Sequence, residues 1–273
     1  MTKVKLALCQ MNVVDNKQLN LEKAGSMISD SADADFIILP EMFNCPYSND
    51  KFIEYAEDEH ESPTLNMMSK LAEDNDAYIL AGSIPERKLD KIYNTSYLFD
   101  KKGQIIAKHR KTHLFDIDVK GRITFKESDV LTAGDEFTLA ETEFGKIGIG
   151  ICYDVRFVEF ARIMAEKGAQ ILFYPGAFNI TTGPAHWELL FRSRALDNQV
   201  FCVGVAPALN MNASYHSYGH SIVTNPWGEV VSQASEKEDL IIHEIDLNEI
   251  KKVRQEIPIL KNKRDDLYEV IEK

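Results

Sequence analysis

The sequence has no long hydrophobic run, no paired cysteines and no glycine-rich phosphate-binding loop. None of its apolar stretches approaches the roughly 18 residues that a membrane-spanning helix needs. Its four cysteines are scattered with no Cys-x-x-Cys pair, which favours a reducing compartment over a disulfide framework. The missing phosphate loop argues against ATP-dependent amidation. We therefore expect a cytoplasmic protein that uses no cofactor.

Linkers, internal repeats and an excess of basic charge are missing as well. No Pro/Gly/Ser-rich segment divides the chain, so we expect a single domain over residues 1–273. The net charge of −12 argues against nucleic acid or an anionic membrane as a partner. The N-terminal MTKVKLALCQMNVVDN is basic and then apolar, but its apolar part is short and lacks a cleavage site. It predicts a first strand rather than a signal peptide.

What the sequence does contain is an alternation of short apolar runs and amphipathic stretches. The runs predict strands at residues 4–9, 35–40, 78–83, 93–99, 104–109, 137–140, 146–152, 170–174, 200–205, 221–224, 229–232 and 241–245. Helical spacing predicts helices at 20–31, 63–74, 158–167, 184–197 and 247–254.

The connections between these runs indicate the fold class. Turn signals at Asp100–Gly103 and Asn225–Gly228 require antiparallel pairs, whereas interleaved helices favour parallel strands. We therefore expect an α/β fold in which two mixed sheets lie face to face with helices outside. The stretch from Lys111 to Gly134 is predicted to be a long irregular loop, and such loops inside compact domains are usually functional.

Cys152 is the strongest candidate for a catalytic residue. It closes the apolar run Lys146–Ile151 and leads directly into a helical pattern. A cysteine on a sharp strand-to-helix turn holds its sulfur near backbone N–H groups, where a thiol can act as a nucleophile. The alternative for a lone cysteine is an inert, buried side chain.

Two other segments strengthen the catalytic interpretation. Glu41 follows a buried strand, where α/β folds place ligands and where desolvation raises a carboxyl pKa. Lys111 stands at the mouth of the long loop. Because a thiol is only a few per cent thiolate at neutral pH, it needs such a base and such a cation. Taken singly, Glu41 and Lys111 would each be better explained as solvated surface residues.

Three segments resemble the signature regions of the nitrilase superfamily of carbon–nitrogen hydrolases: LPEMF around Glu41, RKTHLFD around Lys111 and GICYDVRF around Cys152. The order and spacing agree over essentially the whole chain. Two further stretches, YPGAFNITTGPAHWELLFRSRALDNQ and GHSIVTNPWGEV, resemble the omega-amidase branch. The resemblance implies an α-β-β-α sandwich and a homodimer of eight layers, with a C-terminal tail at about 255–273 packing at the dimer interface.

The resemblance also implies roles for individual residues. Cys152 would be the nucleophile, Glu41 the general base and acid, and Lys111 the oxyanion stabiliser. Glu127, in the segment ITFKES, would orient the substrate or the attacking water. The backbone N–H of Tyr153 is the expected second oxyanion donor. Position 154 is Asp, so the sequence lacks the Gly-x-nucleophile-x-Gly pattern of α/β-hydrolases.

The resemblance points to monoamides of small dicarboxylic acids, with 2-oxoglutaramate and 2-oxosuccinamate as the expected substrates. Arg156 could pair bidentately with a carboxylate, although a structural salt bridge is an equal alternative. Thr181 or Thr182 could cap the following helix and present N–H groups to an anion, or serve as a plain cap. Phe115 and Phe178 are expected to wall the pocket.

Several other interpretations remain open from the sequence alone. A nitrilase, a deaminated-glutathione amidase or an N-carbamoyl hydrolase would share the three catalytic residue types. A non-catalytic binding or scaffold protein on the same fold is the alternative of a different class. His109 and His113 have the spacing of a metal pair, but His109 lies on a predicted strand, so we expect hydrogen-bonding roles and no metal.

Overall fold

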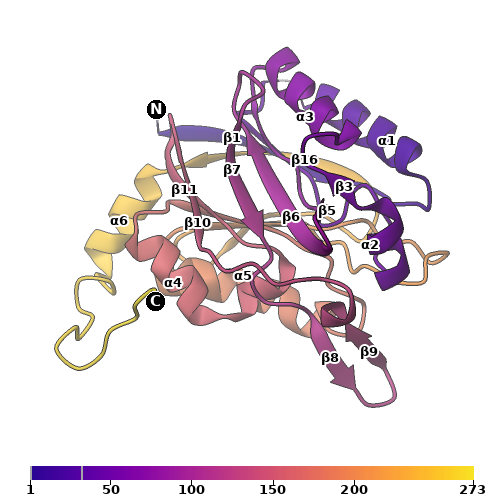
Figure 1. The fold of residues 1–273 in the computed structure, drawn as a ribbon. Coiled ribbons are helices and arrows are strands. Elements are labelled where there is room, and N and C mark those ends of the chain that lie inside the picture. The colour runs from indigo at the N-terminus through magenta and orange to yellow at the C-terminus, as the bar shows by residue number, and fades with distance from the viewer. Residues whose placement is uncertain (1, 32) are drawn as a thin grey trace.

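The structure is a computed structural model that describes residues 2–31 and 33–273. Two β-sheets form its centre, with helices on both outer sides, so that the elements stack as helix, sheet, sheet and helix (Figure 1). This arrangement confirms the predicted α-β-β-α sandwich. The six α-helices of the described residues are α1 (Lys17–Ser29), α2 (Asn49–Tyr55), α3 (Pro63–Asp74), α4 (Val158–Glu166), α5 (Gly183–Asn198) and α6 (Asn248–Glu256).

Both sheets are mixed, as predicted. The first has the order β16 (Asp239–Asp246), β1 (Lys3–Gln10), β2 (Phe36–Ile38), β4 (Tyr78–Leu80), β6 (Lys91–Phe99), β5 (Ile84–Lys88) and β3 (Glu57–Asp58), with β7 (Ile105–Arg110) also paired to β6. The second has the order β10 (Thr138–Thr142), β11 (Gly145–Ile149), β12 (Ile171–Pro175), β13 (Phe201–Val205), β14 (Ile222–Thr224) and β15 (Val230–Gln233). In each sheet the central strands run parallel and the hairpin partners antiparallel.

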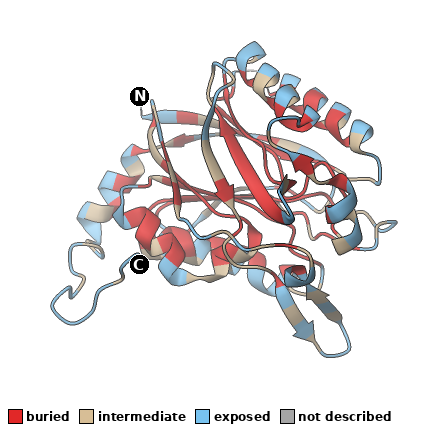
Figure 2. Ribbon diagram, viewed as in Figure 1, coloured by how far each residue is buried: buried red, intermediate tan, exposed pale blue. Residues whose placement is uncertain are grey.

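The central strands, such as β2, β4, β12 and β13, are buried on both faces, which explains their continuous apolar sequences. Between the sheets, Leu6 and Leu8 of β1 belong to the same core as Ile149 of β11 and Phe173 of β12. The opposite face of the first sheet packs against α1 and α3, and that of the second sheet against α4 and α5. Figure 2 shows the result, with buried strands and with helices that expose only their outer faces.

The long segment after Lys111 is more ordered than predicted. It contains a hairpin of β8 (Asp116–Val119) and β9 (Ile123–Lys126), followed by a 3₁₀ helix at Glu127–Asp129. The hairpin projects from the body of the molecule (Figure 1). Its alternation is weak because both faces are partly exposed, and this left it without a clear strand pattern in the sequence.

The predicted start of the first helix at residue 20 was too late. Helix α1 begins at Lys17 because the side chain of Asn16 accepts a hydrogen bond from the backbone N–H of Leu19. The sequence analysis did not predict helix α2 or strands β3 and β5.

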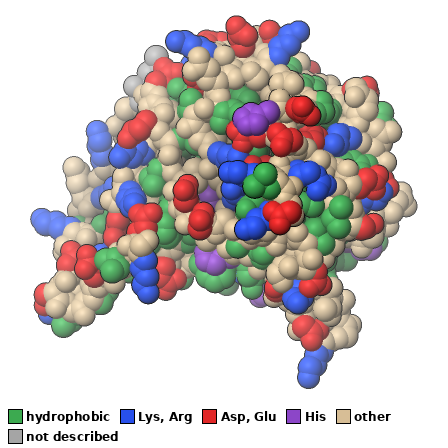
Figure 3. Space-filling view, viewed as in Figure 1, with side chains coloured by type: hydrophobic (Ala, Val, Ile, Leu, Met, Phe, Trp, Pro, Cys, Tyr) green, Lys and Arg blue, Asp and Glu red, His purple; other side chains and the backbone are tan. Residues whose placement is uncertain are grey.

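None of the helices in the described ranges is long and apolar enough to cross a membrane. Acidic and basic side chains are interspersed over the face shown in Figure 3.

Candidate active site

The three predicted catalytic residues meet between the two sheets. Glu41 follows β2 and Lys111 follows β7, so both belong to the first sheet. Cys152 follows β11 of the second sheet. Glu41 and Lys111 are completely buried, and Cys152 is 4% exposed. The carboxyl ends of strands from both layers therefore deliver one charged cluster to the interior.

Lys111 holds two carboxylates at the centre of this cluster. Its Nζ lies 2.9 Å from Oε1 of Glu41 and 2.9 Å from Oε1 of Glu127. Glu127 is also completely buried. Ionised groups this far from water are stable only when paired and hydrogen-bonded. The structure thus brings Glu127 beside Glu41 and Lys111.

Backbone and side-chain donors fix the orientation of both carboxylates. The amide of Asn94 donates to Oε1 of Glu41 at 2.8 Å, and the N–H of Ala177 donates to Oε2 at 2.8 Å. For Glu127, the N–H of Phe115 donates to Oε2 at 2.6 Å. Each carboxylate therefore has a defined direction before any substrate binds.

Cys152 sits on the sharp turn that the sequence predicted. Its φ is +46°, in the left-handed region that costs a non-glycine residue about 1 to 3 kcal/mol. A 3₁₀ helix runs from Cys152 to Arg156, so the N–H of Tyr153 lies in its first turn, where N–H groups lack intrahelical partners. Strain of this kind is typical of a turn that presents a nucleophile.

Asp154 ties this turn to the first sheet. Its carboxylate accepts hydrogen bonds from the N–H groups of Ile151 and His113, both at 2.9 Å. The ring nitrogens of His113 and His109 lie 2.7 and 3.1 Å from it. These contacts hold the pKa of Asp154 well below its ordinary value despite burial. They explain why Asp can stand at this position, and they confirm hydrogen-bonding roles for both histidines.

Replacing Asp154 by Asn should lower the free energy of unfolding by about 2 kcal/mol or more at pH 7, because histidine and amide donors lose a charged acceptor. The depressed folded-state pKa contributes stability above the unfolded value of about 4, and this stability is lost as pH falls through the folded pKa. The deficit of the variant should therefore shrink below about pH 4. Urea unfolding across pH measures it. The exposed Asp118→Asn is the control, and an equal deficit in that control would contradict the role of Asp154.

Burial and neighbouring charges set the proton affinities in the cluster. Burial raises the pKa of Glu41, and the charge of Glu127 raises it further, while Lys111 opposes the shift. Burial and then the Glu41 carboxylate raise the pKa of the Cys152 thiol well above its ordinary value, again against Lys111. The carboxylates raise the pKa of Lys111 despite its burial. At neutral pH the free site therefore holds a thiol beside a base that accepts protons readily.

Arg156 lies at the end of the same 3₁₀ helix, with its guanidinium carbon 4.7 Å from the ring centre of Phe178 and 5.5 Å from that of Tyr153. Its Nη1 is 3.3 Å from Nδ1 of His186, and its Nε is buried without a hydrogen-bond partner. Among the ion pairs of the described residues, none involves Arg156. The structural salt bridge considered from the sequence is therefore wrong.

The aromatic and threonine predictions have different outcomes. Phe115 and Phe178 are both buried, and the ring of Phe115 packs edge-on against Tyr153 at 5.3 Å. The threonine cap is wrong, because Thr182 makes no side-chain cap to α5. The backbone N–H groups of Thr181 and Thr182 donate instead to Oδ1 of Asn179, at 2.9 and 3.0 Å. Asn179 lies only two and three residues before Thr181 and Thr182, so its side chain can accept from their N–H groups in place of a threonine hydroxyl.

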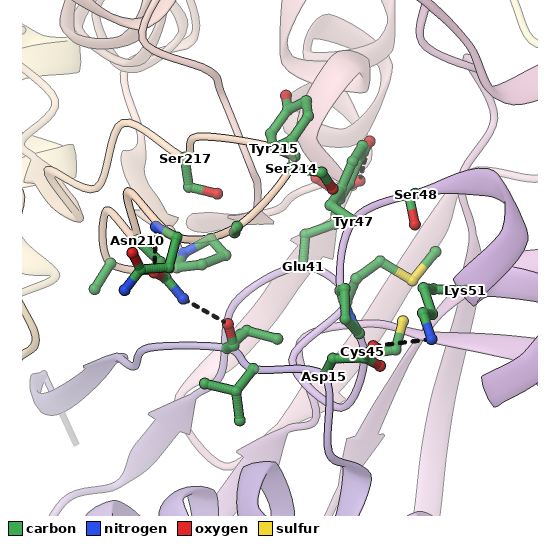
Figure 4. A pocket seen from close by; sticks show the side chains of 18 of the residues that line it. Asp15, Glu41, Cys45, Tyr47, Ser48, Lys51, Asn210, Ser214, Tyr215 and Ser217 are labelled. Carbon is green, nitrogen blue, oxygen red and sulfur yellow. Dashed lines mark hydrogen bonds and ion pairs between the residues drawn. The ribbon is translucent and has the colours of Figure 1, made fainter.

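A cavity of about 640 Å³ adjoins the cluster (Figure 4). Glu41 is the one predicted catalytic residue among those lining it, together with Tyr47 and Tyr215. The rings of these tyrosines are 4.5 Å apart. The hydroxyl of Tyr215 donates to the carbonyl of Ala177 at 2.6 Å. The two tyrosines thus belong to both the cavity wall and the surroundings of the cluster.

Sequence reasoning missed three residues of the site: Tyr47, Asn94 and Ala177. A usable signal existed for Asn94, whose amide side chain stands in β6, a strand that is buried except at its first residue. Tyr47 lies six residues after Glu41 and directly follows Pro46, which is a weaker signal. Ala177 contributes only a backbone N–H, for which the side chain gives no sign. Among the described residues, no group of His, Cys, Asp and Glu is placed to hold a metal ion.

Comparisons with known proteins show which family this chain belongs to. The sequence profile of the carbon-nitrogen hydrolase family matches residues 5–255. The chain is 48% identical over 272 residues to human omega-amidase NIT2, covering 99% of this chain and 98% of that protein. It is 49% identical over 275 residues to omega-amidase NIT2-A of Xenopus laevis, covering 100% and 99%. The crystal structure of Saccharomyces cerevisiae Nit3, a member of branch 10 of the nitrilase superfamily, superposes with a TM-score of 0.89 at 43% identity, covering 96% of this chain and 97% of Nit3.

Proposed function

Because this chain belongs to the carbon-nitrogen hydrolase family, we propose that it is an omega-amidase that hydrolyses the terminal amide of small dicarboxylic acid monoamides. The observation that carries the proposal is the Lys111 ammonium held between Glu41 and Glu127, in a buried cluster with the Cys152 turn. This set supplies a nucleophile, a base and a cation at one point. The identity to omega-amidases extends over the whole chain.

In the first half of the reaction, Cys152 attacks the amide carbon while Glu41 accepts the thiol proton. The raised pKa of the thiol makes this transfer necessary, and the raised pKa of Glu41 makes it a competent acceptor near neutrality. Lys111 and the N–H of Tyr153 stabilise the oxyanion. Glu41 then returns the proton to the nitrogen, ammonia departs, and a thioester to Cys152 remains.

In the second half, water cleaves the thioester. Glu41 accepts a proton from this water, and the hydroxide equivalent attacks the thioester carbon beside the same oxyanion donors. Glu127 holds Lys111 and orients the water or the substrate. The thiolate of Cys152 leaves and recovers its proton from Glu41, so the site returns to its starting state with the free dicarboxylate as product.

Arg156 is the proposed recognition site for the second carboxylate of the substrate. The guanidinium has a buried Nε without a partner and no acidic neighbour, so a bound carboxylate would supply the missing acceptor. The rings of Phe178 and Tyr153 lie beside the guanidinium. Phe115 packs against Tyr153 and Thr181 precedes α5, but neither is among the residues that line the cavity beside Glu41. We propose 2-oxoglutaramate or 2-oxosuccinamate as the substrate.

Ammonia release from a panel of short omega-amides, with and without a second carboxylate, tests this function. Omega-amides that carry the carboxylate should be hydrolysed much faster than their neutral analogues. A preference for nitriles would identify a nitrilase. A preference for carbamoyl compounds or longer peptide-like amides would identify one of the other amidases of the family. If nothing in the panel is hydrolysed and no acyl group forms on Cys152, a non-catalytic protein is indicated.

Replacing Arg156 by Lys should reduce kcat/KM for 2-oxoglutaramate roughly tenfold to a hundredfold, since lysine cannot form the two parallel hydrogen bonds of a guanidinium. The neutral amide analogue, which has no carboxylate to bind, should lose little. Steady-state kinetics with both substrates measure the difference. An unchanged kcat/KM for 2-oxoglutaramate would show that Arg156 does not bind the carboxylate.

The remaining proposals concern assembly and location. The tail after α6 lies against α4, where Lys263 pairs with Glu166 at 2.8 Å. It exposes Leu267, Tyr268 and Ile271, whose apolar surface suits burial against a second copy. We propose that this side contributes to a homodimer. The four cysteines are free and buried, in keeping with the proposed cytoplasmic location.

A further inference from the structure

The hydroxyl of Tyr47 contacts the charged cluster, although Tyr47 has no role in the proposed mechanism. Tyr47 lies in the loop between β2 and α2 and is 8% exposed. Its oxygen is 2.6 Å from Oε1 of Glu127, to which it donates, and lies 3.4 Å from Nζ of Lys111. Oε1 of Glu41 is farther, at 3.5 Å. The short contact identifies Glu127 as its partner.

The ring of Tyr47 is held rigidly. It packs edge-on against Phe52 of α2 at 5.2 Å and lies 5.4 Å from the ring of Phe125 on β9. On its remaining side it meets Tyr215 at 4.5 Å. Three different segments therefore fix the position of the hydroxyl, so its hydrogen bond to Glu127 is not an incidental contact of a mobile side chain.

Two carboxylates and only one ammonium surround this hydroxyl, so the carboxylates need a further hydrogen-bond donor. Glu41 and Glu127 face a single ammonium, that of Lys111, while Cys152 and Tyr215 are the other titratable groups near Tyr47. An ammonium has three N–H donors: Lys111 gives two of them to the carboxylates at 2.9 Å, and the third makes only a long contact of 3.4 Å with the Tyr47 hydroxyl. The third is the one that the oxyanion needs. A further donor to Glu127 spares Lys111 from satisfying that carboxylate alone.

Tyr47 is suited to remain that donor. Burial, followed by the charges of Glu127 and Glu41, raises the pKa of its phenol well above the ordinary value. The hydroxyl therefore keeps its proton throughout the pH range in which the enzyme would work. It cannot serve as the general base, and it does not compete with Glu41 for the thiol proton.

We propose that Tyr47 is a positioning residue that acts through Glu127: its hydroxyl fixes the Glu127 side chain, and Glu127 in turn fixes Lys111 so that one ammonium N–H stays available to the oxyanion. This inference rests on the proposed amidase function. It assigns no chemical step to Tyr47, and it predicts effects on turnover rather than on substrate binding.

Tyr47→Phe keeps the packed ring and removes only the donor. We expect kcat at pH 7 to fall roughly tenfold to a hundredfold, the factor that a hydrogen bond to a charged group supplies, with KM changed less than about threefold. Without the Tyr47 donor, Lys111 is drawn toward Glu127 and lowers the pKa of Glu41 less, so the acidic limb of the pH–kcat profile should move up by about one pH unit. An unchanged kcat and pH profile would overturn the proposal.

Tyr97→Phe is the matched control. Tyr97 is a completely buried tyrosine, and its hydroxyl has no hydrogen-bond partner in the described structure. It lies on β6, in the core that faces α1 and α3. This variant should retain the wild-type kcat and pH profile. Loss of activity in both variants by the same factor would mean that a buried hydroxyl matters only for general packing, which contradicts the proposal.

A double-mutant cycle with Glu127→Gln tests whether Tyr47 acts through Glu127. In the Glu127→Gln background, Tyr47→Phe should lower the residual kcat by less than about threefold, because the charged acceptor is already gone. Measurements at high enzyme concentration make the residual rate accessible. Full additivity of the two losses would show that Tyr47 acts by another route.

Alkylation of Cys152 by iodoacetamide gives a readout that needs no substrate. Lys111 lowers the pKa of this thiol, so a displaced Lys111 should shift the pH midpoint of alkylation upward in Tyr47→Phe, by roughly half a unit or more. Peptide mapping assigns the modified cysteine. If the wild type releases no ammonia from any omega-amide, the proposed function fails, yet the alkylation shift still decides on Tyr47: an unchanged midpoint rejects the positioning role.

Discussion

Cys152→Ala is expected to abolish amide hydrolysis, with kcat reduced by at least roughly 10⁴-fold, while the free energy of unfolding changes by less than about 1 kcal/mol. The sulfur is the only atom that forms the thioester, and neither Glu41 nor Lys111 can replace it as the nucleophile. Alanine tolerates the left-handed backbone at this position about as poorly as cysteine does, so the strain is the same in both proteins.

The measurement combines ammonia release with mass spectrometry of acid-quenched enzyme. Wild-type enzyme mixed with 2-oxoglutaramate should carry the acyl mass on the peptide that contains Cys152, and the variant should carry none. Cys202→Ala is the matched control, because Cys202 is also a free, buried thiol but lies on β13. It should keep wild-type turnover. Residual activity near the wild-type level in Cys152→Ala would reject the thiol mechanism.

Lys111→Met is expected to have the largest effect on stability, together with loss of turnover. The side chain is completely buried and pairs with Glu41 and Glu127, both also completely buried. Removing the cation leaves two carboxylates close together without compensation, and breaking a buried ion pair in this way costs about 3 to 5 kcal/mol. Methionine matches the length of the lysine stem, so packing contributes little to the loss.

The pH dependence of this loss has a defined sign. Lys111 lowers the pKa of Glu41, so its removal raises the pKa further, and the folded variant gains stability when a proton binds. The deficit relative to wild type should therefore be greatest at pH 8 and should decrease toward pH 5. Urea unfolding at several pH values measures it. Adding Glu41→Gln to Lys111→Met should restore part of the stability at pH 8.

An exposed lysine provides the control for this experiment. Lys126 is 60% exposed and pairs only with Asp129, so Lys126→Met should change the unfolding free energy by less than about 0.5 kcal/mol at any pH. If Lys111→Met were equally mild, the carboxylates would have to be neutral in the folded wild type. The site would then lack the ionised Glu41 carboxylate that the proposed mechanism needs as its base.

The sequence was informative where a local pattern determines a local structure. The apolar run before Cys152 predicts a strand, and the abrupt change after it predicts the strained turn that is found. Lys111 at the end of β7 and Glu41 after β2 could be placed for the same reason. The two-sheet architecture followed from buried strands combined with hairpin turns.

What the sequence could not supply are contacts that exist only after folding. Ala177 donates to Glu41 across 136 positions in the chain, and Tyr47 reaches Glu127 across 80. Their residue types carry no pattern that indicates such pairings. The helix cap failed for a local reason, since Asn179 and Thr182 are both good capping residues and only the folded geometry shows that Asn179 takes the donors.

The proposed catalytic groups are divided between the two sheets, with Glu41 and Lys111 following strands of one and Cys152 following a strand of the other. No covalent linkage near the site sets their spacing. Apolar side chains between the layers do so instead, among them Leu8 and Phe173. The thickness of this apolar core therefore determines whether the thiol of Cys152 and the carboxylate of Glu41 are close enough for proton transfer.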